Sequence, residues 1–367
     1  MGHALRRRSP VTAPTERNRL DVAETVSASV AEVAGCALVE FVESRGRLGA
    51  IVVTASSRMF VDLGSGAVAA GLAEGAHRSL RQLAPAIGHP ASRLLVRSAT
   101  GQLAGLRSLL ADPLRTVLER ATEIVVVPVG GLHLVPWSVV FGRPVAVSPS
   151  AAVWSAAASS TIASTSADRT VARSDEGTLV VAGPRLDGAV REARSIGALH
   201  TGSTLLEGAA ATASHFLRGA DGARLVHVAC HSRFRADNPL FSTLELADGP
   251  VTGFELERLQ RAPGAMVLSA CSTGRVSARA GGELLGLATM LLAAGTSALV
   301  TSMLPLPDER AVPALESVHR ALIDGSTIGD AVFGLTSDVD PTDPGDLVLA
   351  SALTCYGRGD WRLTPAT

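Results

Sequence analysis

Two residues that could act together in nucleophilic catalysis each end an apolar, strand-like segment. His231 ends RLVHVACH, and Cys271 ends GAMVLSAC. Residues at the carboxyl ends of neighbouring parallel strands meet at one edge of the sheet. A histidine beside a thiol there stabilises the thiolate and later protonates a leaving group. The spacing alone also fits a buried core thiol and an ordinary loop histidine. Because free cysteine is usually buried, the residues by themselves favour that structural interpretation.

Other motifs point more weakly to chemistry. His227 and His231 stand four residues apart and would share a face of a strand, but no third and fourth ligand follows at a zinc-site spacing. His133, after a Gly-Gly pair, is expected to be a loop histidine. The chain has no GxGxxG motif, no GxSxG motif and no lysine. Dinucleotide binding, serine-hydrolase chemistry, Schiff-base chemistry and lysine-dependent phosphate binding are therefore disfavoured.

The composition is that of a chain with a sizeable core. Of its 367 residues, 47% are hydrophobic and 18% are charged, which excludes wholesale disorder. The 33 basic residues, all of them arginine, nearly balance 34 acidic ones, and the net charge is -1. A general nucleic-acid binder carries a strongly basic surface. We therefore expect no nucleic-acid partner.

Cysteine usage and hydropathy predict the compartment. None of the four cysteines belongs to a CxxC pair, and a chain of this length needs no disulfides, so free thiols in a reducing cytoplasm are expected. Residues 1–20 are basic and lack the apolar segment of a signal peptide. Residues 284–307 are uncharged and long enough to span a membrane. However, Gly295 and the β-branched segment after it predict a buried helix, a turn and a buried strand, with no membrane contact.

The elements around the two residues alternate between strand and helix. The apolar patterns predict strands and helices that follow one another through the second half of the chain: strands at 178–183, 224–230, 264–270, 297–304 and 349–357, and helices at 186–199, 254–259, 282–294 and 312–325. The first half combines strands within 36–64 with helices at 66–84 and 105–121. This order predicts an α/β fold with a mostly parallel sheet flanked by helices.

At these residues the chain resembles the CHAT-domain proteins. HVACHSRFRADNPLFSTLELADGPVTGFELERL is similar to the family's histidine block, and VLSACSTG with GGELLGLATMLLAAGTSALVTSMLPLPD is similar to its cysteine block. IVVVPVGGLHLVPWSVV, LVVAGPRLDGAVREARSIGAL and ALTCYGRGDW are similar to flanking core segments. The likeness extends, with gaps, from about Cys36 to Trp361. This likeness makes a catalytic role, rather than a structural one, the favoured interpretation of His231 and Cys271.

The resemblance implies a caspase- and separase-like cysteine peptidase fold. It assigns the catalytic dyad to His231 and Cys271, and the oxyanion donors to the backbone N–H groups of Ser232 and Cys271. It implies no metal and no cofactor. The family usually has glycine after the histidine, so Ser232 would be strained if that position requires a positive φ. The rival hypotheses are a catalytically inactive scaffold of this fold that binds a protein partner, and an α/β ligand-binding domain.

The resemblance also implies a domain plan and a function. It assigns residues 36–154 to a non-catalytic N-terminal half and 178–367 to the caspase-like catalytic half. Composition predicts a disordered or linker segment at 1–35 and a Ser/Ala/Thr-rich linker loop at 155–177. The expected function is a cysteine endopeptidase that cleaves a protein substrate in bacterial signalling or defence. Because no helical repeats occur in the chain, activation is expected to come from a separate activating protein or from the first half.

Two acidic residues near Cys271 are candidate substrate contacts. Glu283 begins the predicted helix after Cys271, where a first-turn acid is favoured by the unsatisfied N–H groups, and this structural role is preferred to substrate contact. Asp308 lies in LPLPDERAVP, the loop that lines the pocket for the residue before the scissile bond in caspase-like folds. A carboxylate there would select arginine or lysine, although the family often keeps an acid at this position for structural reasons.

Overall fold

The computed structural model describes residues 27–157 and 177–363, apart from 32, 34, 187, 234, 236, 237, 270–279, 307 and 338. Of residues 280–284, 308 and 309 it describes the backbone only. The predicted linker at 155–177 lies mostly outside this range, although residues 151–157 are helical. In the segment assigned to 1–35, residues 27–31 are helical and the side chains of Val30 and Val33 are buried.

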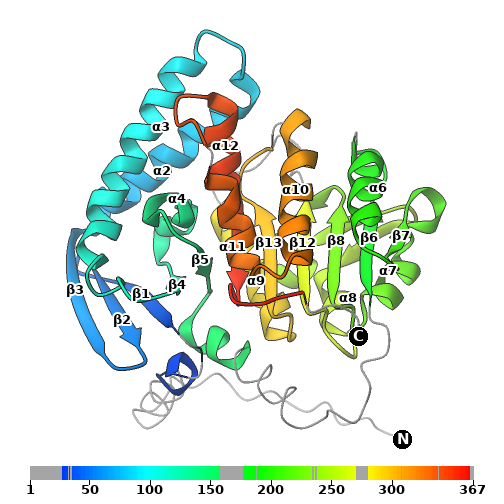
Figure 1. Ribbon diagram of the computed structural model, residues 1–367, viewed down its shortest axis with the longest axis horizontal. Coiled ribbons are helices and arrows are strands. Elements are labelled where there is room, and N and C mark those ends of the chain that lie inside the picture. Colours follow the sequence, from blue (N-terminus) through cyan, green and yellow to red (C-terminus); the bar gives the residue numbers. More distant parts are fainter. Residues whose placement is uncertain are drawn as a thin grey trace, which may run out of the picture.

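One eleven-stranded sheet runs through both halves of the chain (Figure 1). Its strands, in spatial order, are β3 (Arg58–Ser65), β2 (Arg47–Thr54), β1 (Cys36–Ser44), β4 (Glu123–Val127), β5 (Val145–Val147), β14 (Leu353–Gly357), β13 (Ala298–Ser302), β12 (Ala265–Ser269), β8 (Leu225–Ala229), β6 (Thr178–Ala182) and β7 (Thr204–Leu206). The strands β13, β12, β8, β6 and β7 are parallel. The hairpins β1–β2–β3 and the pair β13–β14 are antiparallel.

A separate three-stranded antiparallel sheet follows β8. It consists of β9 (Ser232–Arg233), β10 (Thr243–Leu246) and β11 (Gly249–Thr252). The central strands of the large sheet are apolar and buried along their whole length, as expected for parallel strands covered on both faces.

Helices cover the sheet. They are α2 (Gly66–Leu83), α3 (Ser92–Leu106), α4 (Trp137–Phe141), α6 (Ala189–Leu199), α7 (Ala213–Ala220), α8 (Gly253–Glu257), α9 (Ala280–Ala293), α10 (Asp308–Ile323), α11 (Ile328–Phe333) and α12 (Pro344–Ala352). Short 3-10 and π segments are η1 (Ala84–Ala86), η2 (Arg107–Ala111), η3 (Asp112–Leu114), η4 (Gly130–Leu134), η5 (Gly208–Ala210), η6 (Pro239–Phe241) and η7 (Gly334–Thr336). Figure 1 shows α6 and α10 side by side over β6, β8 and β12.

The predicted fold class, a mostly parallel α/β sheet flanked by helices, is confirmed. The uncharged stretch after Glu283 forms α9, a turn at Gly295 with φ of 110°, and buried strand β13, as predicted. No helix in the described parts of the chain is long and apolar enough to cross a membrane.

Two of the differences between predicted and observed element boundaries have a clear local cause. The helix predicted at 105–121 begins earlier, as α3 at Ser92, and then passes into the π segment η2 and the 3-10 segment η3. Pro113 lies in η3, where its missing N–H prevents a regular helix from continuing. The strand predicted at 349–357 is helix α12 as far as Ala352 and strand β14 only from Leu353. Asp343 caps α12 and Pro344 occupies its first turn, a helix-start pattern that outweighs the apolar run.

Candidate active site

His231 lies directly beyond the carboxyl end of β8. Its Nε2 lies 2.7 Å from the main-chain carbonyl oxygen of Arg185, in the turn between β6 and α6. Because a carbonyl oxygen only accepts, Nε2–H is the donor, and the neutral ring keeps its lone pair on Nδ1. The Arg185 carbonyl therefore sets both the orientation and the tautomer of His231.

The main chain of Arg185 is strained. Its φ is 56°, in the left-handed region, and Arg45 is the only other non-glycine residue with a positive φ in the described ranges. Such a conformation costs on the order of 1 kcal/mol or more for a residue with a side chain. Strained backbone persists where surrounding contacts hold it in place, and it is concentrated at functional sites. Here the strained residue supplies the carbonyl that binds His231.

The remaining ring nitrogen of His231 has an unmet hydrogen-bonding capacity. Nδ1 is buried and has no hydrogen-bond partner among the described residues, and the same holds for Oγ of the adjacent Ser232. Most buried polar atoms in folded proteins are paired. Two neighbouring unpaired atoms therefore mark a place where a further polar group would be favoured.

The register of the sheet relates His231 to the position of Cys271. β8 and β12 are parallel neighbours in which Ala229 lies opposite Ser269. His231 follows Ala229 by two residues, and Cys271 follows Ser269 by two residues. The two chain segments thus leave adjacent strands at the same level. Cys271 itself, within 270–279, lies outside the described residues.

This edge of the sheet is also where the strand order reverses. From β6 the chain moves outward to β7, returns to β8 on the other side of β6, and continues to β12 and β13. Open α/β sheets bind their ligands outside the carboxyl ends of the strands at such a reversal. Arg185 and His231 follow β6 and β8, the two strands that flank it.

Close packing at Gly183 holds these two strand ends together. Its N–H donates to the Ala229 carbonyl at 2.7 Å. A Cβ at this position would lie 2.4 Å from Cys230 Cβ and 2.8 Å from the main-chain oxygen of Glu245. These contacts are shorter than real Cβ contacts, and one of them is with backbone. The end of β6 therefore accepts only glycine here without displacement of its neighbours.

We expect Gly183→Ala to lower the free energy of unfolding by about 1–3 kcal/mol, the usual effect of overpacking. The substitution should also displace the ring of His231, because the turn that holds this ring must shift. The control is Gly71→Ala in α2, where nothing lies within 4 Å of the new Cβ and helix propensity favours alanine by about 1 kcal/mol. Urea unfolding of both variants measures the difference. Equal stability of the two variants would contradict this assignment.

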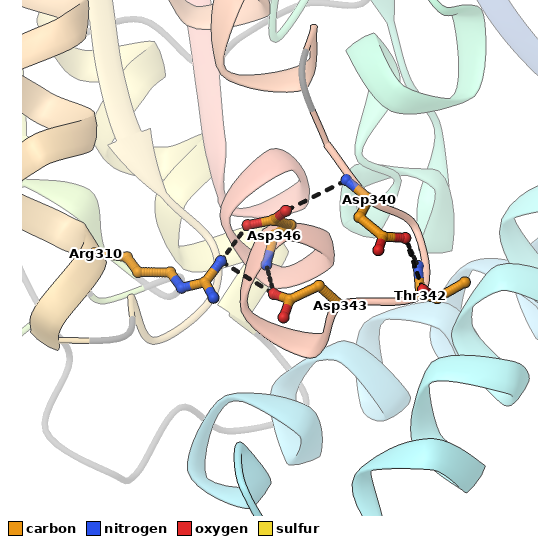
Figure 2. Close-up of polar contacts among 5 residues, drawn as sticks. All are labelled: Arg310, Asp340, Thr342, Asp343 and Asp346. Carbon is orange, nitrogen blue, oxygen red and sulfur yellow. Dashed lines mark hydrogen bonds and ion pairs between the residues drawn. The ribbon is translucent and has the colours of Figure 1, made fainter.

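An ionic cluster lies beside the predicted pocket loop (Figure 2). Arg310, in the first turn of α10, contacts the carboxylates of Asp343, at 3.0 Å, and Asp346. Asp346 also accepts from the N–H of Asp340 at 3.3 Å, and the Asp340 side chain accepts from Thr342. Gly345 makes the arrangement possible, because a Cβ there would lie 2.6 Å from the guanidinium carbon. Two carboxylates thus contact one guanidinium, which leaves an acidic excess.

The comparisons with known proteins identify the family and the fold. The CHAT domain family matches residues 100–336. The chain belongs to the CHAT-domain family. No curated protein matches it significantly. Among solved structures, this CHAT protein is similar to the separase of Saccharomyces cerevisiae in its complex with securin, with a TM-score of 0.65 and 10% identity over 93% of this chain. The CHAT protein spans 31% of the length of the separase chain. The likeness establishes a separase-like fold.

Ser232, which replaces the usual glycine of CHAT proteins, is not strained. It lies in β9 opposite Leu244 of β10 and is absent from the residues with positive φ. The expected cost of a side chain at this position therefore does not arise. Its role as an oxyanion donor stays a prediction.

The other predicted site residues of the CHAT domain are placed by their backbone alone. Asp308 is the first residue of α10, and Glu283 lies in the first turn of α9. These positions agree with first-turn acids, while the side chains lie outside the described part of the structure.

The histidine pair of HVACH has two different hydrogen-bond environments. His227 bonds to Glu192 at 2.9 Å, whereas His231 bonds to the Arg185 carbonyl. No cluster of three or more metal-binding side chains is present in the described ranges.

Two features of the site were missed by sequence reasoning. The carbonyl of Arg185 carries no signal in the sequence, because any residue type supplies a carbonyl. The anchoring of Arg310 was detectable in part, since Asp343, Pro344 and Asp346 form a recognisable helix start.

Proposed function

We propose that this CHAT protein is a cysteine endopeptidase in which Cys271 is the nucleophile and His231 the general acid and base. The register of β8 and β12, in which Ala229 lies opposite Ser269 two residues before each of the two positions, carries the proposal. The unpaired Nδ1 of His231 supports it, since this is the nitrogen that Arg185 leaves free for a thiol.

In this mechanism Nδ1 of His231 takes the proton of the Cys271 thiol, and the thiolate attacks the scissile carbonyl carbon. The backbone N–H groups of Ser232 and Cys271 bind the developing oxyanion. The imidazolium then gives its proton from Nδ1 to the leaving amine as the C–N bond breaks. Water, deprotonated by the same nitrogen, hydrolyses the thioester and restores the thiol. Nε2–H stays bonded to the Arg185 carbonyl throughout, so the ring keeps its orientation.

The remaining thiols provide an internal control. Cys36, Cys230 and Cys355 are buried and free. Burial raises the pKa of Cys230 to about 12, and burial together with nearby carboxylates raises the pKa of Cys36 and Cys355 still further. Because the thiolate is the reactive form, these three thiols are inert at neutral pH. A peptide inhibitor with a thiol-reactive group should therefore label Cys271 alone.

Peptide mapping of the labelled protein by mass spectrometry tests the proposal. We expect one modified site at Cys271 and a much lower rate in His231→Ala, with iodoacetamide on the unfolded protein as the control that all four thiols can react. Labelling of none of the four thiols in the folded protein would support the alternative function, a catalytically inactive scaffold that binds a protein partner.

The cluster around Arg310 bears on specificity. The carboxylates of Asp343 and Asp346, at the start of α12, already pair with the guanidinium of Arg310. This group therefore does not offer a free positive charge to an acidic substrate side chain. The acidic excess of the cluster, with Asp308 at the start of α10, favours a basic side chain in the pocket. We therefore propose cleavage after arginine or lysine.

Fluorogenic peptides that differ only in the residue before the scissile bond measure this preference. We expect Asp308→Ala to reduce the arginine-over-leucine preference about tenfold to hundredfold, in line with the loss of one charged contact of about 1.5–3 kcal/mol. Asp340→Ala is the matched control, since Asp340 caps its own turn and does not contact Arg310. Equal rates for arginine and leucine in the wild type, or a preference for aspartate, would contradict the idea.

The proposed setting is the bacterial cytoplasm, in signalling or defence, with a protein substrate and a separate activating protein. The free, buried thiols are consistent with a reducing compartment. The similar separase structure is a complex with the protein securin, which supports a protein partner for this fold.

A further inference from the structure

A buried chain of hydrogen-bonded histidines joins β8, α6 and α10 and ends at Thr178 of β6. Nε2 of His227, on β8, lies 2.9 Å from Oε1 of Glu192 on α6, and its Nδ1 lies 3.0 Å from Nε2 of His319 on α10. Nδ1 of His319 lies 2.8 Å from Nε2 of His200, which follows α6. Nδ1 of His200 lies 3.3 Å from the hydroxyl of Thr178. His227 and His319 are fully buried, and the other three are at most 8% exposed.

Proton counting gives this chain one direction when all three rings are neutral. A carboxylate oxygen of Glu192 that accepts from Nε2–H of His227 leaves Nδ1 of His227 to accept from Nε2–H of His319. Nδ1 of His319 then accepts from Nε2–H of His200, and Nδ1 of His200 accepts from the Thr178 hydroxyl. With three neutral rings every polar atom is satisfied. Burial lowers the pKa of His200 to about 4 and that of His319 well below its ordinary value, which keeps both rings neutral.

The chain connects the elements that carry the site. His227 precedes His231 by four residues, and α6 begins directly after the turn of Arg185. Helix α10 begins at Asp308 of the predicted pocket, and Figure 1 shows it beside α6. A hydrogen bond from Ser195 to Glu316 is a second link between α6 and α10. His319 is the central ring, since it bonds to histidines of both neighbouring elements.

We propose that His319 is a positioning residue, which fixes the pocket helix α10 relative to His231 through hydrogen bonds whose direction Glu192 sets. This inference rests on the proposed peptidase function. Its structural half, the ordered chain of three neutral rings, stands independently of that function.

Nitrogen-15 NMR of the histidine-labelled full chain tests the structural half. We expect His200, His227 and His319 each to be in the Nε2–H tautomer at pH 7, with N–H protons protected from solvent exchange. Glu192→Gln should preserve this pattern, because the amide oxygen also accepts from Nε2–H. An Nδ1–H tautomer or an imidazolium in any of the three rings would overturn the ordered chain, whether or not the protein cleaves peptides.

Kinetics test the positioning half. His319→Phe removes both bonds while keeping a ring, and we expect about a tenfold to hundredfold loss of kcat/KM, mainly through KM, as for misplaced binding groups. Each rate is divided by the concentration of protein in which the inhibitor labels Cys271. A loss of folded protein therefore does not lower the measured kcat/KM. In His319→Gln the amide both donates and accepts, so this variant should recover part of the loss of kcat/KM. It also replaces His319→Phe as the test if the phenylalanine variant does not fold.

The matched control is His77→Phe, which replaces another buried histidine, on α2. It should leave KM unchanged. An equal change of KM in His77→Phe and His319→Phe would overturn the positioning role. A wild-type protein that neither cleaves peptides nor reacts at Cys271 would instead count against the proposed function, and the NMR result would still decide the chain.

Discussion

Replacement of either Cys271 or His231 by alanine is expected to abolish peptide cleavage. The loss for His231 should be at least about 10²–10⁴-fold, the range for a general acid–base group, and loss of the nucleophile should leave only background. Because both residues act in one unit, the double variant should be no slower than either single one. The fold should persist, since the single described hydrogen bond of the His231 side chain goes to the Arg185 carbonyl.

Initial rates on a fluorogenic peptide, with circular dichroism as the check on folding, measure this effect. Cys36→Ala is the control, because this thiol is buried on β1 and inert. Full activity in Cys271→Ala, or losses that multiply in the double variant, would refute the dyad.

The free energy of unfolding should be greatest near pH 6.5 and fall on both sides. Burial lowers the pKa of His77 and of His200 to about 4, and that of His319 well below its ordinary value. Between about pH 4 and 6.5 the unfolded chain therefore binds protons that the folded chain does not, and stability falls as pH falls. Each histidine contributes about 1.4 kcal/mol per pH unit in this window.

Buried carboxyl groups act in the opposite direction, and burial raises the pKa of Glu40 as it does that of Glu123. Burial, followed by the nearby Asp360, raises the pKa of Glu123 to about 8. Between about pH 4.3 and 8 the folded state holds a proton on this group that the unfolded state has lost. Stability therefore falls by about 2 kcal/mol from pH 6.5 to 8. Below pH 6.5 the buried histidines, which include His133, outnumber the carboxyl groups with raised pKa values, and the acid limb is the steeper one.

Urea unfolding at a series of pH values measures the profile. Glu123→Gln should remove the decline between pH 6.5 and 8, while His77→Gln should flatten the acid limb by about 1.4 kcal/mol per pH unit. A stability that keeps rising from pH 6.5 to 8 would show that Glu123 is ionised in the folded state. A flat acid limb would show that the buried histidines are already charged.

Local patterns determined most of the elements and the fold class. The apolar runs that end at His231 and Cys271 predicted β8 and β12 because a parallel strand buried on both faces is apolar throughout. The resemblance to CHAT proteins was carried by short blocks of residues around these strands, and the family match over residues 100–336 confirms it. These are short-range features, and the sequence contains them in full.

Tertiary structure alone decided how distant segments meet. The sheet places β14, from the end of the chain, between β5 and β13, and no local pattern specifies such a neighbour. The carbonyl of Arg185 faces His231 only because β6 and β8 are adjacent and Gly183 permits their close approach. The same holds for His319 and His200, which are separated by 119 residues yet lie 2.8 Å apart. Pairings of this kind depend on packing between elements, which is why a scan of single segments finds the strand ends but not the groups that orient them.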